Sequence, residues 1–201
     1  MERKVDRIIY GGAFNPPTIA HKRIGMYLCN KYKDALILYM PTNSFYNKGD
    51  LISFNDRFEM TKLLVKDLGD RVAVSNYEGE EHKFSGTYYT LKEFGNPYFV
   101  IGADALQNLS TWIKGEDLIK ENNFIVFPRS GFNIKEIFNQ KILKDNIDHF
   151  IVIDDYQEDD ISSTTYRNEK DKAVLTKEVY DYIEKKGLYR WYYVFKGIYQ
   201  S

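Results

Sequence analysis

Short apolar runs alternate along the chain with longer stretches that have helical periodicity. The apolar runs are typical of buried strands, which we expect at residues 5–10, 35–40, 71–75, 98–102, 123–128 and 150–153. Apolar residues recur every three or four positions between these runs, which predicts helices at residues 18–33, 54–68, 87–94, 105–112, 163–169 and 177–186. Alternating strands and helices predict an α/β fold with a mostly parallel sheet.

In such a sheet, ligands bind beyond the carboxyl ends of the strands, where the strand order reverses. Three predicted strands lead into sequence rich in glycine or hydroxyl groups, at residues 11–17, at residues 102–104 and ahead of residues 161–164. We therefore expect the functional site to be assembled from these three segments.

The first segment combines features that suit an anionic ligand. Gly11 and Gly12 allow close approach to backbone N–H groups, and the helix that follows presents the positive end of its dipole. Thr18 and His21 are three residues apart, so a helix carries them on one face. The alternative is an ordinary Gly-Pro turn with a capping Thr and a surface His. Neither the P-loop nor the dinucleotide-binding glycine pattern is present.

The second anionic segment lies at residues 161–167. Consecutive Ser and Thr residues precede a predicted helix, and Arg167 follows about one turn later, where its guanidinium suits phosphate oxygens. By itself this segment also fits an ordinary capped helix with a surface Arg. Two such segments after two different strands favour a ligand with several phosphates held between them.

Composition narrows the class of protein. The 201 residues carry 28 Lys and Arg against 29 Asp and Glu, a net charge of −1, which disfavours nucleic acid as a partner. A single cysteine, Cys29, excludes a disulfide framework, and three widely spaced histidines disfavour a protein-built metal site. No apolar run approaches the ~18 residues of a membrane span, and the charged start lacks the apolar stretch of a secretory signal.

From these observations we expect a cytoplasmic protein with no membrane partner. One domain over residues 1–201 is expected, with a core at about residues 1–160 and a helical portion at about residues 161–201. A homo-oligomer stays open at this point.

Five segments in register resemble one family, the nicotinate or nicotinamide mononucleotide adenylyltransferases of the (His/Thr)-x-x-His nucleotidyltransferase superfamily. The matching segments are residues 11–21 (Gly-Gly-Ala-Phe-Asn-Pro-Pro-Thr-Ile-Ala-His), 101–106 with Trp112, 128–131 (Pro-Arg-Ser-Gly), 161–167 (Ile-Ser-Ser-Thr-Thr-Tyr-Arg) and 182–190, which ends Lys-Gly-Leu-Tyr-Arg. The resemblance implies a Rossmann-like nucleotidyltransferase fold with helices on both faces of the sheet. It also implies adenylyl transfer from ATP to a pyridine mononucleotide, with Mg²⁺ entering with ATP and no covalent enzyme intermediate.

The resemblance also implies roles for individual residues. The catalytic group is His21, Thr18 and Arg167. The ATP-binding group is Gly12, Ala13, Phe14, Gly102, Asp104, Ser163 and Thr164. The mononucleotide-binding group is Asn15, Lys48, Thr87, Trp112 and Arg129. Trp112 would stack on the pyridine ring, although a core Trp on an amphipathic helix is the alternative. No metal-ligating residue is expected.

The sequence departs from the family pattern mainly on the pyridine side. The usual Pro-His-Lys stretch keeps only Lys48, the Tyr of a Ser-Tyr-Thr segment is Gly86, and the Tyr beside the stacking Trp is Ile113. Thr18 stands where many bacterial members have His. Nicotinate mononucleotide is our first acceptor, nicotinamide mononucleotide the second, and another phosphorylated compound the third.

Two other functions compete with this interpretation. A sister adenylyltransferase or cytidylyltransferase, such as the pantetheine-phosphate type, shares the Thr-x-x-His motif but usually lacks the Ile-Ser-Ser-Thr segment with its Arg. A regulatory nucleotide sensor would keep the pocket without turnover. The presence of both His21 and Arg167 disfavours a sensor, whereas the altered acceptor residues favour it weakly.

Overall fold

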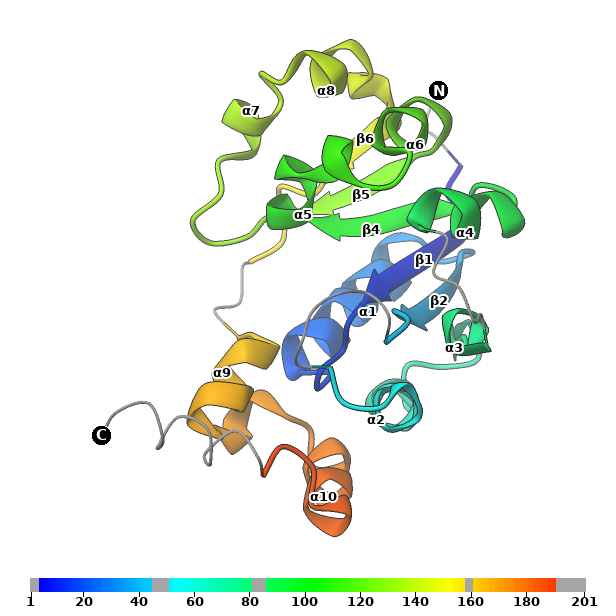
Figure 1. Ribbon diagram of the computed structural model, residues 1–201. Coiled ribbons are helices and arrows are strands. Elements are labelled where there is room, and N and C mark those ends of the chain that lie inside the picture. The colour runs from blue at the N-terminus through cyan, green and yellow to red at the C-terminus, as the bar shows by residue number, and fades with distance from the viewer. Residues whose placement is uncertain (1–3, 45–50, 81–85, 158–160, 191–201) are drawn as a thin grey trace.

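The computed structural model describes residues 4–44, 51–80, 86–157 and 161–190. Six strands form one sheet in the order β3-β2-β1-β4-β5-β6, and every neighbouring pair is parallel (Figure 1). The strands are β1 (Arg7–Gly12), β2 (Leu36–Pro41), β3 (Val72–Val74), β4 (Tyr98–Gly102), β5 (Phe124–Phe127) and β6 (Phe150–Val152). The chain builds outward from β1 to β3 and then resumes on the other side of β1 with β4. The strand order therefore reverses between β1 and β4, as the α/β prediction requires.

Side chains of successive strand residues point to opposite faces of the sheet, so both faces carry apolar side chains. Helices cover both faces. Ile8 and Tyr10 belong to one buried cluster, whereas Ile9 between them belongs to the other. The first cluster receives α1 (Ile19–Lys31), α2 (Phe54–Val65), α9 (Ser163–Glu169) and α10 (Lys177–Lys186). The second receives α4 (Thr87–Glu93), α5 (Ala103–Gln107) and α6 (Gly115–Glu121). The predicted fold class is confirmed.

The C-terminal helices pack against the first half of the chain, where Figure 1 shows α9 and α10 beside α1 and α2. The Tyr182 hydroxyl on α10 donates to Asp56 Oδ1 at 2.9 Å, and Lys66 pairs with Glu178 at 2.9 Å. Ser53 caps α2 by accepting from the Asp56 N–H. The contacts of Tyr182 and Lys66 hold α10 against α2.

Several predicted boundaries and elements were wrong. The single helix expected at 105–112 is α5 followed by a 3₁₀ turn, η1 (Leu109–Thr111), because Asn108 ends α5 and the chain then turns to bury Leu109. The helix expected at 54–68 ends at Val65, and the strand expected at 71–75 is limited to β3. Short elements that the apolar pattern did not indicate are α3 (Tyr77–Glu80), α6, α7 (Ile134–Ile137), α8 (Lys141–Asp145), η2 (Ile147–His149) and η3 (Lys172–Val174).

These short elements have local causes that a period of 3.6 residues does not reveal. Lys114 adopts a left-handed conformation just before α6, and a Cβ on Gly115 would lie 2.4 Å from the Ser110 carbonyl oxygen. Only glycine fits so close an approach. Within the described ranges, none of the helices has both the length and the apolar character needed to cross a bilayer.

Candidate active site

Two adjoining cavities open at the carboxyl ends of β1, β4 and β5, where the strand order reverses. The first, here called the α9 cavity, has a volume of about 460 Å³ and lies against the residues that begin α9. The second, here called the α4 cavity, has a volume of about 300 Å³ and extends toward α4. The residues that line both cavities are Tyr10, Ala13, His21, Ile24, Asp104 and Arg129. The three segments singled out in the sequence do meet at this edge of the sheet.

His21 stands where the two cavities join, and the backbone fixes its ring. The Thr18 N–H donates to His21 Nδ1 at 2.9 Å, with Thr18 Oγ1 2.8 Å from the same nitrogen. Because Nδ1 accepts this backbone N–H, the neutral ring carries its proton on Nε2. Burial, followed by the positive charge of Arg129, lowers the pKa of His21 to about 4. Near neutral pH His21 is therefore an uncharged hydrogen-bond donor.

Thr18 and Phe14 contact the His21 side chain but are not among the residues that line the two cavities. Thr18 is the N-cap of α1 and is fully buried, so the helix begins one residue later than predicted. The Phe14 ring is also buried and meets the His21 ring edge-on, with the ring centroids 5.1 Å apart. Gly12 lines the α4 cavity through its backbone.

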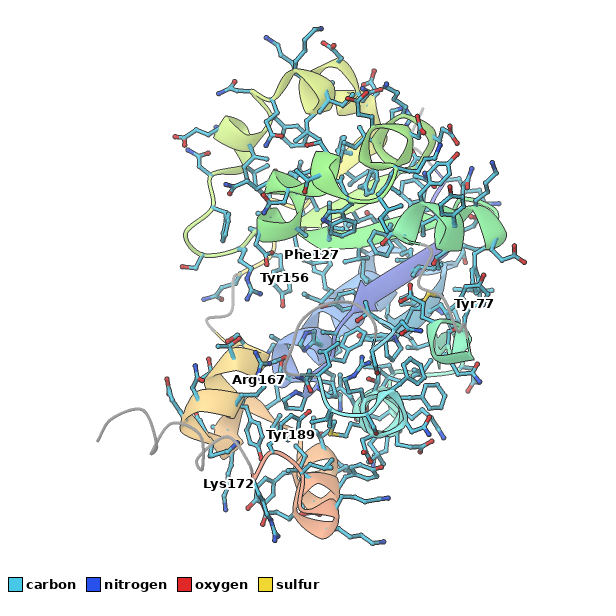
Figure 2. All side chains as sticks on the ribbon, viewed as in Figure 1. Tyr77, Phe127, Tyr156, Arg167, Lys172 and Tyr189 are labelled. Atoms are coloured by element: carbon cyan, nitrogen blue, oxygen red, sulfur yellow. The ribbon has the colours of Figure 1, made fainter. Side chains whose placement is uncertain are left out.

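Helix α9 fastens the turn after β1 from the opposite side, and Figure 2 shows Arg167 between α9 and the rest of the molecule. Arg167 Nη1 donates to the Asn15 carbonyl at 2.7 Å and Nη2 to Thr164 Oγ1 at 3.1 Å. The Ser163 hydroxyl donates to the Pro16 carbonyl at 2.7 Å. Arg167 Nε is buried and has no hydrogen-bond partner among the residues that the structure describes. All four of these polar residues line the α9 cavity: Asn15, Ser163, Thr164 and Arg167.

The Asn15 side chain is itself buried, with 2% of its surface exposed. Its Oδ1 accepts from the Tyr189 hydroxyl at 2.9 Å and from the Ile52 N–H at 3.4 Å. Tyr189 comes from the Lys-Gly-Leu-Tyr-Arg segment at the far end of the chain. The C-terminal portion therefore helps to hold the turn that follows the first strand.

Asp104 and Arg129 face each other at the mouth of both cavities. Arg129 Nε lies 3.8 Å from Asp104 Oδ2, and each side chain is about half exposed. Gly102 precedes Asp104, and a Cβ there would lie 2.5 Å from Asp104 Oδ1. A larger residue at 102 would displace the carboxylate, so glycine at this strand end allows Asp104 to occupy its position.

The α4 cavity has an aromatic and apolar wall with a few polar groups. Trp112 and Phe99 provide the aromatic surface, while Thr87 and Thr90 of α4 and the carboxylate of Glu78 provide the polar groups. The Trp112 ring contributes to the cavity and also packs against the second buried cluster. The packing agrees with the core interpretation of Trp112, and stacking on a pyridine ring stays a prediction.

Two of the departures from the family pattern are in contact with each other. Gly86 has φ +102°, and a Cβ on it would lie 2.9 Å from Ile113 Cβ. The missing Tyr at 86 and the missing Tyr at 113 are thus one local change at the N-terminus of α4. The predicted mononucleotide-binding residue Lys48 lies outside the described residues.

Sequence reasoning missed two buried charged residues near the site, Arg57 and Glu78. Arg57 is fully buried in α2, where the sequence analysis counted only the apolar residues. Glu78 is 8% exposed and lies in α3. No pattern in the sequence separates these charged residues from the exposed ones, because their burial depends on distant segments.

In the part of the chain that the structure describes, no three His, Cys, Asp or Glu side chains come together as a metal-binding group.

Comparisons with known proteins agree with this geometry. The family model described as Cytidylyltransferase-like matches residues 9–169. A probable nicotinate-nucleotide adenylyltransferase of Acholeplasma laidlawii is 37% identical over 140 residues, which cover 67% of this chain and 73% of the relative. A second protein of that name, from Clostridium acetobutylicum, is 30% identical over 197 residues, which cover 91% and 98%.

Solved structures give the same result. Plasmodium falciparum nicotinic acid mononucleotide adenylyltransferase complexed with NaAD superimposes with a TM-score of 0.76 at 26% identity, covering 92% of this chain and 97% of that chain. The same enzyme complexed with APC gives a TM-score of 0.74. A family match over most of the chain, together with relatives of this identity and coverage, means that the chain belongs to the cytidylyltransferase-like family and groups there with the nicotinate-nucleotide adenylyltransferases.

Proposed function

We propose that this protein transfers the adenylyl group of ATP to nicotinate mononucleotide, forming the deamido form of NAD and pyrophosphate. The observation that carries this proposal is the position of His21, which lines two adjoining cavities of different character and carries its proton on Nε2. One cavity is polar and suits a polyphosphate, and the other is largely apolar and suits an aromatic ring. The names of the relatives support the same assignment.

The reaction is a direct displacement at phosphorus. An oxygen of the mononucleotide phosphate attacks the α-phosphorus of ATP, a new P–O bond forms, and the bond to the β-phosphate oxygen breaks so that pyrophosphate leaves. Because the substrate is already a charged nucleophile, the protein needs no nucleophile–base pair. Its contribution is to position both substrates and to stabilise charge on the transferring phosphoryl oxygens. His21 Nε2–H donates to one of these oxygens.

The α9 cavity takes the triphosphate in this proposal. Ser163, Thr164 and Arg167 hold the β- and γ-phosphates, and Ala13 contributes backbone groups. Arg167 suits this role because its guanidinium is anchored by Asn15 and Thr164 while it faces the cavity. Gly102 and Asp104 contact the adenosine half. ATP brings Mg²⁺ as part of the substrate, held by phosphates and water.

The α4 cavity takes the mononucleotide. Trp112 stacks on the pyridine ring, Thr87 lies near its substituent, and Arg129 lies toward its phosphate. Asn15 reaches this phosphate from the adjoining α9 cavity, and Lys48 is proposed as a further contact. Nicotinate is preferred over nicotinamide because the curated relatives carry the nicotinate name. The cytoplasmic location and the homo-oligomer remain predictions.

The test is release of pyrophosphate from ATP and Mg²⁺ with nicotinate mononucleotide or nicotinamide mononucleotide supplied in parallel. We expect turnover with both components present and a higher kcat/KM for the nicotinate compound. Preference for the nicotinamide compound would overturn the acceptor assignment alone. Binding of ATP without pyrophosphate release from either compound would favour a nucleotide sensor and overturn the enzymatic proposal.

A further inference from the structure

One peptide group after β2 is held between two buried charges. Arg57 Nη2 donates to the Thr42 carbonyl at 2.7 Å, and the Asn43 N–H donates to Glu78 Oε2 at 3.0 Å. The carbonyl of Thr42 and the N–H of Asn43 belong to the same planar peptide group and point in opposite directions. The guanidinium therefore contacts the negative end of this peptide dipole, and the carboxylate contacts its positive end.

Both charges are removed from water. Arg57 is fully buried and Glu78 is 8% exposed. Burial raises the pKa of Glu78, while the hydrogen bonds from Asn43 and Thr90 and the charge of Arg57 oppose that shift. Burial lowers the pKa of Arg57 to about 10. A buried charge is costly to leave uncompensated, so the intervening peptide and its two charged partners form one interdependent unit.

The same two side chains reach different parts of the active site. Arg57 Nη1 donates to the Ala13 carbonyl at 2.8 Å, and Ala13 lines both cavities. Glu78 Oε1 accepts from the Thr90 hydroxyl at 3.4 Å, and both of these residues line the α4 cavity. A second bond joins Asn43 Nδ2 to the Glu78 carbonyl at 2.5 Å. The unit thus connects the turn after β1 with the wall formed by α3 and α4.

We propose that this Arg57–peptide–Glu78 bridge positions the wall of the α4 cavity against the turn after β1, which makes Glu78 a positioning residue for the mononucleotide. The inference rests on the proposed function, because it assigns the α4 cavity to the acceptor. Glu78 acts through Asn43 and Thr90 and takes no part in bond making. Its charge matters because an ionised acceptor forms a stronger hydrogen bond than a neutral one.

The main test is Glu78→Gln, which nearly preserves the shape of the side chain but removes the charge and replaces one of the two accepting oxygens with a donating NH2 group. We expect KM for nicotinate mononucleotide to rise about tenfold, with KM for ATP within about twofold of wild type. Unchanged KM for the mononucleotide would overturn the proposal. An equal rise in both KM values would also overturn it, because it would indicate a general loss of structure.

The matched control is Glu121→Gln. Glu121 Oε2 accepts from the Tyr88 hydroxyl of α4 at 2.8 Å, but Glu121 does not belong to the lining of the α4 cavity. The control removes a carboxylate bonded to the same helix and should leave both KM values within about twofold of wild type. A rise in mononucleotide KM equal to that of Glu78→Gln would show that the effect is not specific to the bridge.

A second variant tests whether the two charges act together. Arg57→Lys keeps the positive charge but loses the fork that reaches Ala13 and Thr42, so it should raise KM for both substrates. In the double variant Arg57→Lys/Glu78→Gln, KM for the mononucleotide should be less than about threefold higher than in Arg57→Lys alone, because the bridge is already weakened there. Full additivity would overturn the bridge.

Absence of turnover in the wild-type enzyme would refute the proposed function, whereas wild-type turnover with an unaffected Glu78→Gln variant would refute the bridge alone.

Discussion

The α9 and α4 cavities meet at one histidine but are built in different ways. In the α9 cavity, side chains from late in the chain donate to backbone carbonyls of the turn after β1, as Ser163 does to Pro16 and Arg167 to Asn15. In the α4 cavity, buried side-chain charges hold a backbone peptide after β2. The sequence matches its family at the first and departs from it at the second.

The difference indicates which residues of each cavity can be exchanged without loss of binding. A polyphosphate is recognised by N–H and O–H groups at fixed positions, so the α9 cavity depends on residue identity at a few sites. A flat ring is recognised largely by shape and apolar contact, so the α4 cavity can exchange Tyr for Gly86 and Ile113 if neighbouring groups keep the wall in place.

His21→Ala should impair both halves, because His21 is shared by the two cavities. We expect kcat to fall by about 10²–10³-fold, as is typical when a positioned donor to a developing charge is lost. Steady-state pyrophosphate release measures this. His149→Ala is the control, since His149 lies just before β6, at the amino end of that strand, where its Nδ1 is 2.8 Å from the Asn122 carbonyl oxygen. Near-normal kcat in His21→Ala would remove His21 from the mechanism.

Arg167→Lys should affect the α9 cavity alone. The loss of a forked contact to Asn15 and Thr164 should raise KM for ATP by about 10-fold or more and leave KM for the mononucleotide nearly unchanged. Arg71→Lys is matched, because Arg71 also forks onto backbone carbonyls, those of Tyr32, Ala35 and Cys29, away from the two cavities. That control should lower stability without changing either KM. Equal KM shifts for both substrates in Arg167→Lys would contradict the division between the cavities.

Gly86→Ala should affect the α4 cavity and stability together. An Ala at φ +102° is strained and its Cβ would lie 2.9 Å from Ile113 Cβ, so we expect a loss of about 1–3 kcal/mol in the free energy of unfolding. Mononucleotide KM should also rise. Gly69→Ala separates the two causes, because Gly69 has φ +90° with nothing within 4 Å of a Cβ. If urea titrations find the two variants equally destabilised, the Ile113 contact is of no consequence.

The smallest effect is the pH dependence that His21 contributes to stability. Its folded pKa of about 4 lies below the ordinary value of 6.5, so the unfolded chain binds the proton more readily between these values. Stability from this group is therefore fully present well above pH ~6.5 and is lost as pH falls toward about 4, with about 1 kcal/mol of the loss between pH 7 and pH 5.5. His21→Asn should remove this component from urea titrations. An identical pH dependence in wild type and His21→Asn would contradict it.

The long elements could be predicted from the sequence, and α9 and β4 have the predicted boundaries. Both follow patterns carried within a few residues, a hydroxyl cap in one case and a continuous apolar run in the other. Helices of four or five residues such as α3 and α8 were missed, since so few residues give little periodicity. The break between α5 and η1 was also missed because it depends on how Leu109 is buried.

In the candidate site too, residues with a local sequence signal could be predicted and residues whose role depends on tertiary burial could not. The segments at 11–21, 102–104 and 161–167 could be named from the sequence, because their glycines and hydroxyls are local signals and their order matches a known family. Burial of Arg57 and Glu78 gives no such signal. Each looks like an ordinary charged residue until α2, α3 and the turn after β2 are packed together.

By itself, then, the sequence determined the parallel α/β architecture, the family and the segments that form the phosphate half, since backbone preferences, apolar periodicity and short motifs are properties of neighbouring residues. Only the tertiary structure decided which side chains share a cavity, that Thr18 fixes the proton of His21 on Nε2, and that two buried charges hold one peptide. The shared cavity lining and the held peptide depend on contacts between distant parts of the chain, where burial and distance rather than local pattern set the strength of each interaction. The contact of Thr18 with His21 spans only three residues, but it depends on side-chain geometry that the sequence pattern does not show.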